Sequence, residues 1–186
     1  KRIENKIKAQ SINDFYVCSL STQTIIYKGM FLAEQLSEFY PDLLDNEFTS
    51  KFAIYHQRYS TNTFPTWSLA QPFRVLAHNG EINTLKGNIN WMSAHEPRIT
   101  HPFFNERIND LKPILDPDAS DSASLDAAFE LFVQTDRDMP MAKSMIIPES
   151  WSNRSDLSDQ LKAMYAYCNA VIEPWDCLLY TSPSPR

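Results

Sequence analysis

The chain has 186 residues, of which 43% are hydrophobic and 22% are charged, and its formal net charge is −6. This length suits one domain with a substantial core, and an aromatic content of 12% argues against disorder. The acidic balance, with no cluster of Lys or Arg, argues against a nucleic-acid partner. The longest apolar run, the six residues 163–168, is too short to cross a bilayer, and three glycines cannot form a glycine-rich phosphate loop.

The first half of the chain predicts strands and loops. Residues 13–27 read as a β-hairpin, because two segments rich in aromatic and β-branched residues flank a polar turn. Residues 31–39 have a short helical face that ends before Pro41. Residues 52–59 and 75–77 predict strands, and the polar, proline-broken stretch 60–72 between them predicts a loop.

The second half predicts helices. Residues 82–92 form one, and apolar residues at helical spacing over 125–133 form a second, with Ser120, Asp121 and Ser122 as candidate N-caps. A third helix covers 157–172 and ends before Pro174. Because strands precede helices without alternating with them, the sequence predicts an α+β fold.

The last ten residues, CLLYTSPSPR, have no periodic face. They match the translation of a sequencing-library adapter, so we expect 1–176 to be the native domain and 177–186 to be an adapter-derived tail. The alternative is a disordered Ser/Pro tail.

Two polar segments, 56–63 and 77–84, hold the residues best suited to chemistry. Arg58 carries a planar cation that can grip a carboxylate, with the hydroxyl of Thr61 nearby in sequence. Asn79 and Gly80 offer a side-chain amide and a backbone N–H for an oxyanion hole. The plain alternatives are a surface ion pair for Arg58 and a hairpin turn for Asn79-Gly80, although the helical pattern after Gly80 disfavours the hairpin.

These segments carry a resemblance to a known family. Residues 15–176 resemble the glutaminase domain of glutamate synthase, a class-II glutamine amidotransferase. The matching strings include FYVCSLS, HQRYSTNTFPTW, LAQPFRVLAHNGEINTLKGNINWM, SDSASLD and VIEPWD. The H-x-R-x-S-T and HNG strings are general to class-II amidotransferases, and the longer combination points to glutamate synthase.

The resemblance implies a role for each candidate residue. Arg58, assisted by Thr61, would bind the α-carboxylate of glutamine, and Asp121 would pair with its α-ammonium group. Asn79 and Gly80 would stabilise the tetrahedral oxyanion. The alternative for Asp121 is a helix N-cap, and one carboxylate could serve both purposes.

The family's nucleophile is a cysteine at the mature N-terminus, whereas this chain starts with Lys1. Cys18, in a predicted strand, and Cys168, on an apolar helix face, read as buried packing residues. We therefore expect an internal fragment without glutaminase activity of its own. The implied fold is the four-layer αββα sandwich of N-terminal-nucleophile hydrolases, truncated at both ends.

The resemblance also implies a larger enzyme. Ammonia from glutamine would pass to synthase domains of the same polypeptide and convert 2-oxoglutarate to glutamate, using FMN, an iron–sulfur cluster and NAD(P)H or ferredoxin. None of these cofactors is expected in this segment, and a reductase subunit is a possible partner. The expected location is the cytoplasm, or the plastid in a photosynthetic eukaryote.

Two other interpretations stay open on sequence alone. The chain could come from another class-II amidotransferase, which feeds ammonia to a phosphosugar or to aspartate, or from a non-catalytic module that binds glutamine or a protein partner. The four histidines match no zinc-ligand spacing, so no metal site is expected. Phe64 and Trp67 could form a lid over the substrate or simply anchor their loop.

Overall fold

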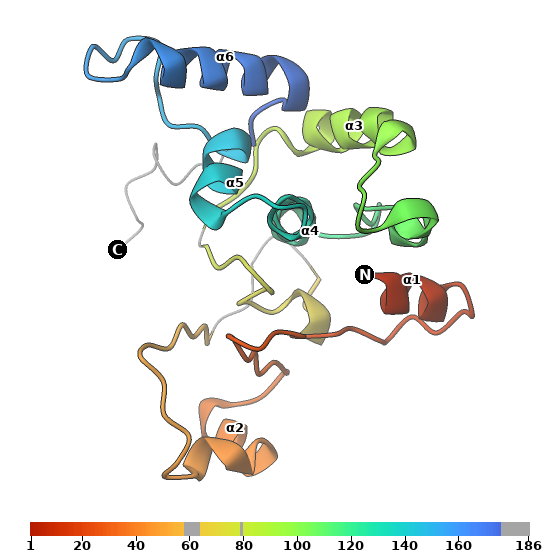
Figure 1. Cartoon of the computed structure of the whole chain (residues 1–186). Coiled ribbons are helices and arrows are strands. Elements are labelled where there is room, and N and C mark those ends of the chain that lie inside the picture. The colour runs from red at the N-terminus through yellow and green to blue at the C-terminus, as the bar shows by residue number, and fades with distance from the viewer. Residues whose placement is uncertain (58–63, 79, 176–186) are drawn as a thin grey trace. The chain divides into compact units, whose positions relative to one another are not determined.

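The computed structural model describes residues 1–57, 64–78 and 80–175. The chain divides into two compact units, a larger one of Lys1–Phe15 with Asn79–Arg186 and a smaller one of Tyr16–His78. The larger unit contains five α-helices in its described residues, labelled in Figure 1: α1 (Arg2–Lys8), α3 (Leu85–His95), α4 (Asp121–Gln134), α5 (Met139–Ile146) and α6 (Asp159–Ile172). It also contains 3₁₀ turns at Glu96–Arg98 and Asn105–Leu111.

The helix predicted over 125–133 is confirmed as α4. Its apolar face is buried, with Leu125 and Ala128 each 1% exposed. The N-cap is Ser120, whose Oγ accepts a hydrogen bond from the backbone N–H of Ala123 at 3.2 Å. Asp121 is therefore the first residue of the helix and not its cap.

The two other predicted helices of this unit also form. α3 begins at Leu85, three residues later than the apolar pattern suggests, because Ile82 forms a bridge and 83–84 form a turn. α6 begins after Ser158, whose Oγ accepts from the N–H of Leu161 at 3.2 Å. The two helices pack together, and His95 Nε2 lies 2.8 Å from the carbonyl oxygen of Val171.

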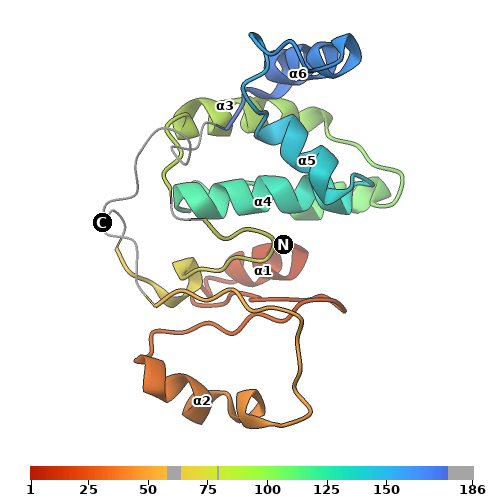
Figure 2. The same ribbon diagram turned by 90° about the vertical axis from the view of Figure 1, so that its left-hand side faces the viewer.

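Helix α5 was not predicted. It packs against both α4 and α6, as Figure 2 shows, and its residues Ala142 and Ile146 are fully buried. Its start carries two local signals: the Asp138 carboxylate accepts from the N–H of Met141 at 2.7 Å, and Pro140 stands in the first turn.

Helix α1 was also not predicted, and charged side chains anchor it. Arg2 donates to Asp110 Oδ2 from Nε at 2.9 Å and from Nη2 at 2.7 Å, and Lys8 lies 2.7 Å from Asp116 Oδ2. The hydrogen bond from Arg2 lowers the pKa of Asp110. Burial raises the pKa of Asp116, but the hydrogen bond from Lys8 acts in the opposite direction and the net pKa is lowered.

The smaller unit surrounds a buried cation. Lys28, 5% exposed, donates from Nζ to the carbonyl of Ser68 at 2.9 Å and lies 4.6 Å from the ring centroids of both Tyr16 and Phe73. The unit holds α2 (Leu36–Phe39) and 3₁₀ turns at Ala33–Gln35, Pro41–Leu44 and Trp67–Leu69. The predicted helical segment 31–39 is thus confirmed in shortened form.

The expected α+β fold, a four-layer αββα sandwich, is wrong for the described residues. The structure assigns none of them to a β-strand, and Ile82 alone forms an isolated bridge. The predicted hairpin 13–27 and the strand 75–77 are absent, as is the described part of the strand 52–59. Alternating apolar residues make a strand only where a neighbour completes the hydrogen-bond ladder. The side chains of Phe52 and Ile54, which a half-buried strand would partly cover, are 75% and 60% exposed.

Candidate functional site

The best-defined part of the site is the N-terminus of α4. The carboxylate of Asp121 accepts a hydrogen bond from the backbone N–H of Ile82 at Oδ2, 3.0 Å away. Its Oδ1 accepts from the N–H of Ser122 at 2.6 Å and from the Ser122 hydroxyl at 3.3 Å. Asp121 therefore joins the start of α4 to the segment that follows Gly80. Gly80 lies two residues before Ile82 in the chain.

This contact brings two of the predicted site residues, Asp121 and Gly80, into one region. Gly80 and Ile82 lie in a short connection, and Ile82 is 6% exposed. Because Asp121 is the first residue of α4, its carboxylate lies at the positive end of the helix dipole. An anionic group in such a place can bind a cation without losing its own stabilisation.

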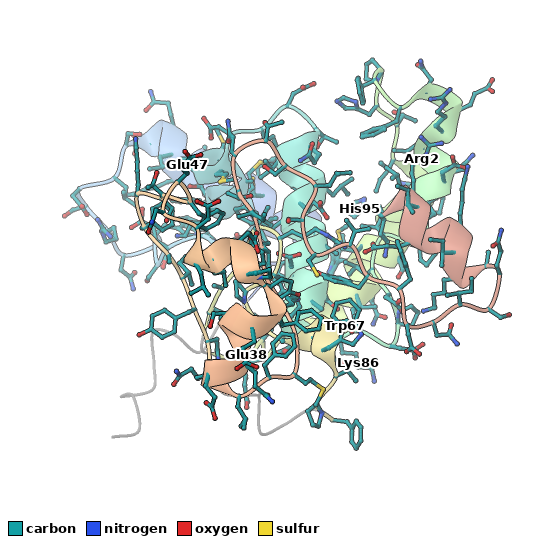
Figure 3. All side chains as sticks on the ribbon, turned by 90° about the horizontal axis from the view of Figure 1, so that it is seen from below. Arg2, Glu38, Glu47, Trp67, Lys86 and His95 are labelled. Carbon is teal, nitrogen blue, oxygen red and sulfur yellow. The ribbon has the colours of Figure 1, made fainter. Side chains whose placement is uncertain are left out.

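Three predicted site residues, Arg58, Thr61 and Asn79, lie outside the described residues. Their roles remain expectations from the sequence. On the loop that follows Thr61, Phe64 is 86% exposed. Trp67, labelled in Figure 3, is half-buried with its ring edge against Tyr16, at 6.0 Å between centroids. The contact of Trp67 agrees with the loop-anchor interpretation.

A second set of contacts, which sequence reasoning missed, holds the other end of the connection. Asn88 is fully buried, and its Nδ2 donates to the carbonyls of Glu173 at 3.0 Å and Pro174 at 3.2 Å. Its Oδ1 accepts from the hydroxyl of Thr84 at 2.6 Å. These bonds clamp the first turn of α3 to 173–174, and we call them the Asn88 clamp. The VIEPWD string marks one side of it, but nothing local marks Asn88.

The clamp is extended by the residue that follows it. Trp175, 1% exposed, donates its backbone N–H to the carbonyl of Ile146 at 2.9 Å. The segment 173–175 therefore connects the ends of α3, α5 and α6. This arrangement holds the start of α3 in place, and with it the residues that follow Gly80.

The thiol of Cys168 is not placed to act as a nucleophile. Cys168 is 2% exposed, and burial raises the pKa of its thiol, which disfavours the reactive thiolate. This confirms the prediction that it is a packing residue. Cys18 is only half-buried and does not lie in a strand, so the prediction of a buried strand cysteine is wrong at this position.

Within 1–57, 64–78 and 80–175, no three His, Cys, Asp or Glu side chains gather in a way that could hold a metal ion. His95 instead contacts α6, and His101 pairs with Asp136 at 3.1 Å. Over the same residues, every helix is too short or too polar to cross a membrane.

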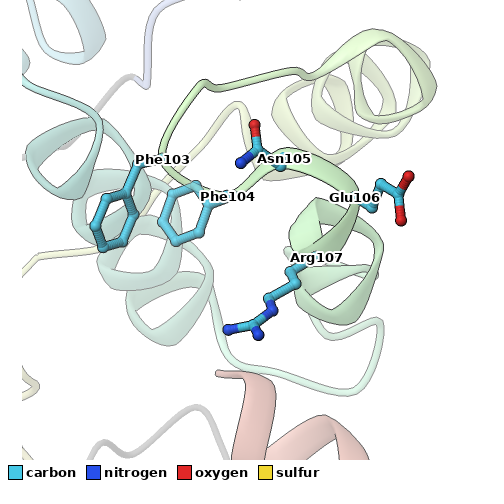
Figure 4. A pocket seen from close by; sticks show the side chains of 5 residues that line it. All are labelled: Phe103, Phe104, Asn105, Glu106 and Arg107. Carbon is cyan, nitrogen blue, oxygen red and sulfur yellow. The ribbon is translucent and has the colours of Figure 1, made fainter.

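A hollow on the surface, drawn in Figure 4, lies away from these residues in sequence. It is lined by five consecutive residues, Phe103, Phe104, Asn105, Glu106 and Arg107. None of them is a predicted site residue, and the hollow is made by one loop and the start of one 3₁₀ turn. It is not the candidate site.

Comparison with known proteins decides the family. The model of the family "Glutamine amidotransferases class-II" matches residues 1–179. The chain belongs to the class-II glutamine amidotransferases. The resemblance seen in the sequence is confirmed.

The relatives of this amidotransferase chain are glutamate synthases. It is 61% identical over 176 residues to the glutamate synthase [NADPH] large chain of Azospirillum brasilense, with 95% of this chain and 12% of that protein covered. It is 52% identical to the corresponding chain of Bacillus subtilis over 163 residues, with 88% and 11% covered. The ferredoxin-dependent glutamate synthase of Pyropia yezoensis is 49% identical over 166 residues, again with 88% and 11% covered. The chain therefore spans about one ninth of the length of these relatives.

Proposed function

We propose that this chain forms part of the glutaminase site of a glutamate synthase, where L-glutamine is hydrolysed to glutamate and ammonia. Family membership supports the reaction class, and the names of the relatives favour glutamate synthase over other class-II amidotransferases. The contact between Asp121 and Ile82 is the structural observation that carries the proposal. Asp121, proposed to bind the substrate ammonium, accepts a hydrogen bond from Ile82, two residues after the proposed oxyanion donor Gly80, and this proximity supports the two roles.

The reaction follows from what each group offers. The family's nucleophilic cysteine gives its thiol proton to its own α-amino group, and the thiolate attacks the side-chain amide carbon of glutamine and forms a C–S bond. The carbonyl electrons move onto oxygen, where the Asn79 amide and the Gly80 N–H donate hydrogen bonds to the oxyanion. The C–N bond then breaks, and the leaving amino group takes the proton back from the α-amino group and departs as ammonia. Water then cleaves the thioester, giving glutamate and the free thiol.

The substrate's two charged ends need opposite partners. The guanidinium of Arg58, with the hydroxyl of Thr61, binds the α-carboxylate, because a planar fork matches a carboxylate in a bidentate way. Asp121 binds the α-ammonium group. Together the two residues orient the side-chain amide toward Asn79 and Gly80.

The rest of the proposed enzyme would use the ammonia. Synthase domains of the same polypeptide would convert 2-oxoglutarate to glutamate with FMN, an iron–sulfur cluster and electrons from NAD(P)H or ferredoxin, with a reductase subunit as a further partner. The described residues do not fit a cluster, since Cys18 and Cys168 are the cysteines among them and no metal-binding group forms. No step of glutamine hydrolysis is therefore assigned to these cofactors. A cytoplasmic or plastid location is part of the same proposal.

The experiment is a glutaminase assay of the complete protein. Asn79→Ala should lower kcat for glutamine hydrolysis by about 10²–10³-fold, the usual cost of losing an oxyanion donor. Asn153→Ala, at an exposed position, is the matched control and should leave kcat unchanged. A complete protein that releases no ammonia from glutamine would overturn the proposed function. An unchanged kcat in Asn79→Ala would remove only Asn79 from its role.

A further inference from the structure

We infer that Asp121 is also a positioning residue, whose carboxylate holds the turn that carries Gly80 through the backbone N–H of Ile82. The inference rests on the proposed function and goes beyond it. One side chain would then link recognition of the substrate ammonium to the placement of the oxyanion donor.

The geometry leaves the carboxylate able to do both. An ionised carboxylate can accept about four hydrogen bonds. The described residues donate three of them, from the N–H of Ile82 and from the N–H and hydroxyl of Ser122. An ammonium group can therefore bind the same carboxylate without displacing Ile82.

The position of Asp121 suits it to act as a support. α4 is anchored at its start by the Ser120 cap and along its length by the buried Leu125 and Ala128. The connection from Gly80 to α3 is held at its far end by the Asn88 clamp. The hydrogen bond between Asp121 and Ile82 links α4 to the other end of this connection, close to Gly80.

Losing the hydrogen bond between Asp121 and Ile82 should be costly in free energy. Hydrogen bonds to a charged acceptor are stronger than neutral ones. The Ile82 side chain is 6% exposed, so its N–H lies in a region where losing the acceptor leaves a donor with little access to water. Removing the carboxylate should free the turn, and a displacement of about 1 Å at a reacting group can cost about 10²-fold in rate.

Two substrates separate positioning from ammonium binding. L-Glutamine has the α-ammonium group, and 5-amino-5-oxopentanoate has the same amide without it. In the complete protein, Asp121→Ala should lower kcat on both substrates by about 10–10²-fold. Asp121→Asn keeps an oxygen acceptor for Ile82 but loses the charge, so it should raise KM for L-glutamine while keeping kcat on both substrates near the wild-type value.

Ser120→Ala is the matched control, because it removes the α4 cap and leaves the carboxylate of Asp121 in place. Hydrogen exchange gives a readout that needs no turnover. The amides of residues 80–84 should exchange at least tenfold faster in Asp121→Ala than in Ser120→Ala, and Asp121→Asn should restore their protection.

The outcomes are distinct. The inference is overturned if Asp121→Ala raises KM for L-glutamine alone, with wild-type kcat on both substrates. It is equally overturned if the amides of residues 80–84 exchange at the same rate in Asp121→Ala and in the wild type. The exchange result decides the matter even if the enzyme does not hydrolyse 5-amino-5-oxopentanoate. Failure of the wild-type protein to hydrolyse L-glutamine would instead count against the proposed function, while the exchange result would still decide whether Asp121 holds the turn.

Discussion

A Cβ atom added to Gly87 would lie 2.4 Å from Oε2 of Glu173. Gly87 is in the first turn of α3, and Glu173 directly follows α6, so the two helix ends approach closely here. The reason for a glycine at this position is space for the carboxylate, because none of the described glycines is in the left-handed region. Oε2 of Glu173 is itself buried without a hydrogen-bond partner.

Gly87→Ala should have a small effect on α3, because two effects oppose each other. Alanine gains about 1 kcal/mol of helix propensity over glycine. The added methyl group displaces the Glu173 carboxylate, which is the far end of a flexible side chain and can turn away. Hydrogen exchange of the α3 amides in the complete protein should report a change in local stability within about 1 kcal/mol.

The Glu173→Ala background provides the control for this prediction. Without the carboxylate, Gly87→Ala should stabilise α3 by the full value of about 1 kcal/mol, so the cycle should show coupling between the two positions. Equal effects in both backgrounds would mean that the close approach has no energetic consequence.

Asn88→Ala should destabilise the larger unit strongly. The substitution removes the amide that donates to the carbonyls of Glu173 and Pro174 and accepts from the Thr84 hydroxyl. The Thr84 hydroxyl still donates to the Pro174 carbonyl at 3.2 Å, so the Glu173 carbonyl is the group that loses its donor, at about 1–3 kcal/mol, and the rest of the cost comes from the space left by the buried side chain. We expect a total loss of about 2–4 kcal/mol, measured as faster exchange of the α3 amides. Asn90→Ala, on the same helix but not buried, is the control. A loss below about 1 kcal/mol in Asn88→Ala would contradict the importance of the clamp.

The docking of α1 should depend on pH. The pKa values of Asp110 and Asp116 are lowered from 3.8 by hydrogen bonds from Arg2 and Lys8, against the effect of burial that raises the pKa of Asp116. A lowered carboxyl pKa contributes stability that is complete above about pH 4 and is lost as the pH falls through the folded-state value. The hydrogen bond to Asp116 raises the pKa of Lys8 from 10.5. This pair therefore contributes stability that is complete below about pH 10.5 and is lost as the pH rises through the folded-state pKa.

Protection factors of the α1 amides, which correct for the intrinsic pH dependence of exchange, measure this effect. They should be constant near neutral pH and should fall as the solution is acidified below pH 4. Asp110→Asn should lower them already at pH 7. Identical protection in this variant and in the wild type would show that the ion pair does not hold α1.

Arg58→Lys should raise KM for glutamine by about 10-fold or more with little change in kcat, because lysine cannot form the bidentate contact with a carboxylate. Steady-state kinetics of the complete protein measure this. Arg154→Lys is a charge-conserving control on an exposed ion pair with Glu149 and Asp156. If KM is unchanged in Arg58→Lys, Arg58 does not bind the α-carboxylate.

The fold was predictable where the signal is local. The spacing of Leu125, Ala128 and Phe129 predicts α4, because a helix positions residues three and four apart on one face whatever the rest of the chain does. The strands were not predictable in the same way. The pattern around Phe52 and Ile54 describes a half-buried strand, but whether a strand forms depends on a partner that no local pattern specifies.

The amino-acid sequence by itself determined the family, through the long strings around Arg58 and Asn79-Gly80, and it determined α3, α4 and α6 through their periodicity. Only the tertiary structure decided that the Asp121 carboxylate accepts the N–H of Ile82 and that Asn88 clamps 173–174. The physical reason is that these contacts join residues 39 and 85 or more positions apart. Their formation depends on how the helices pack, and no spacing along the chain encodes it.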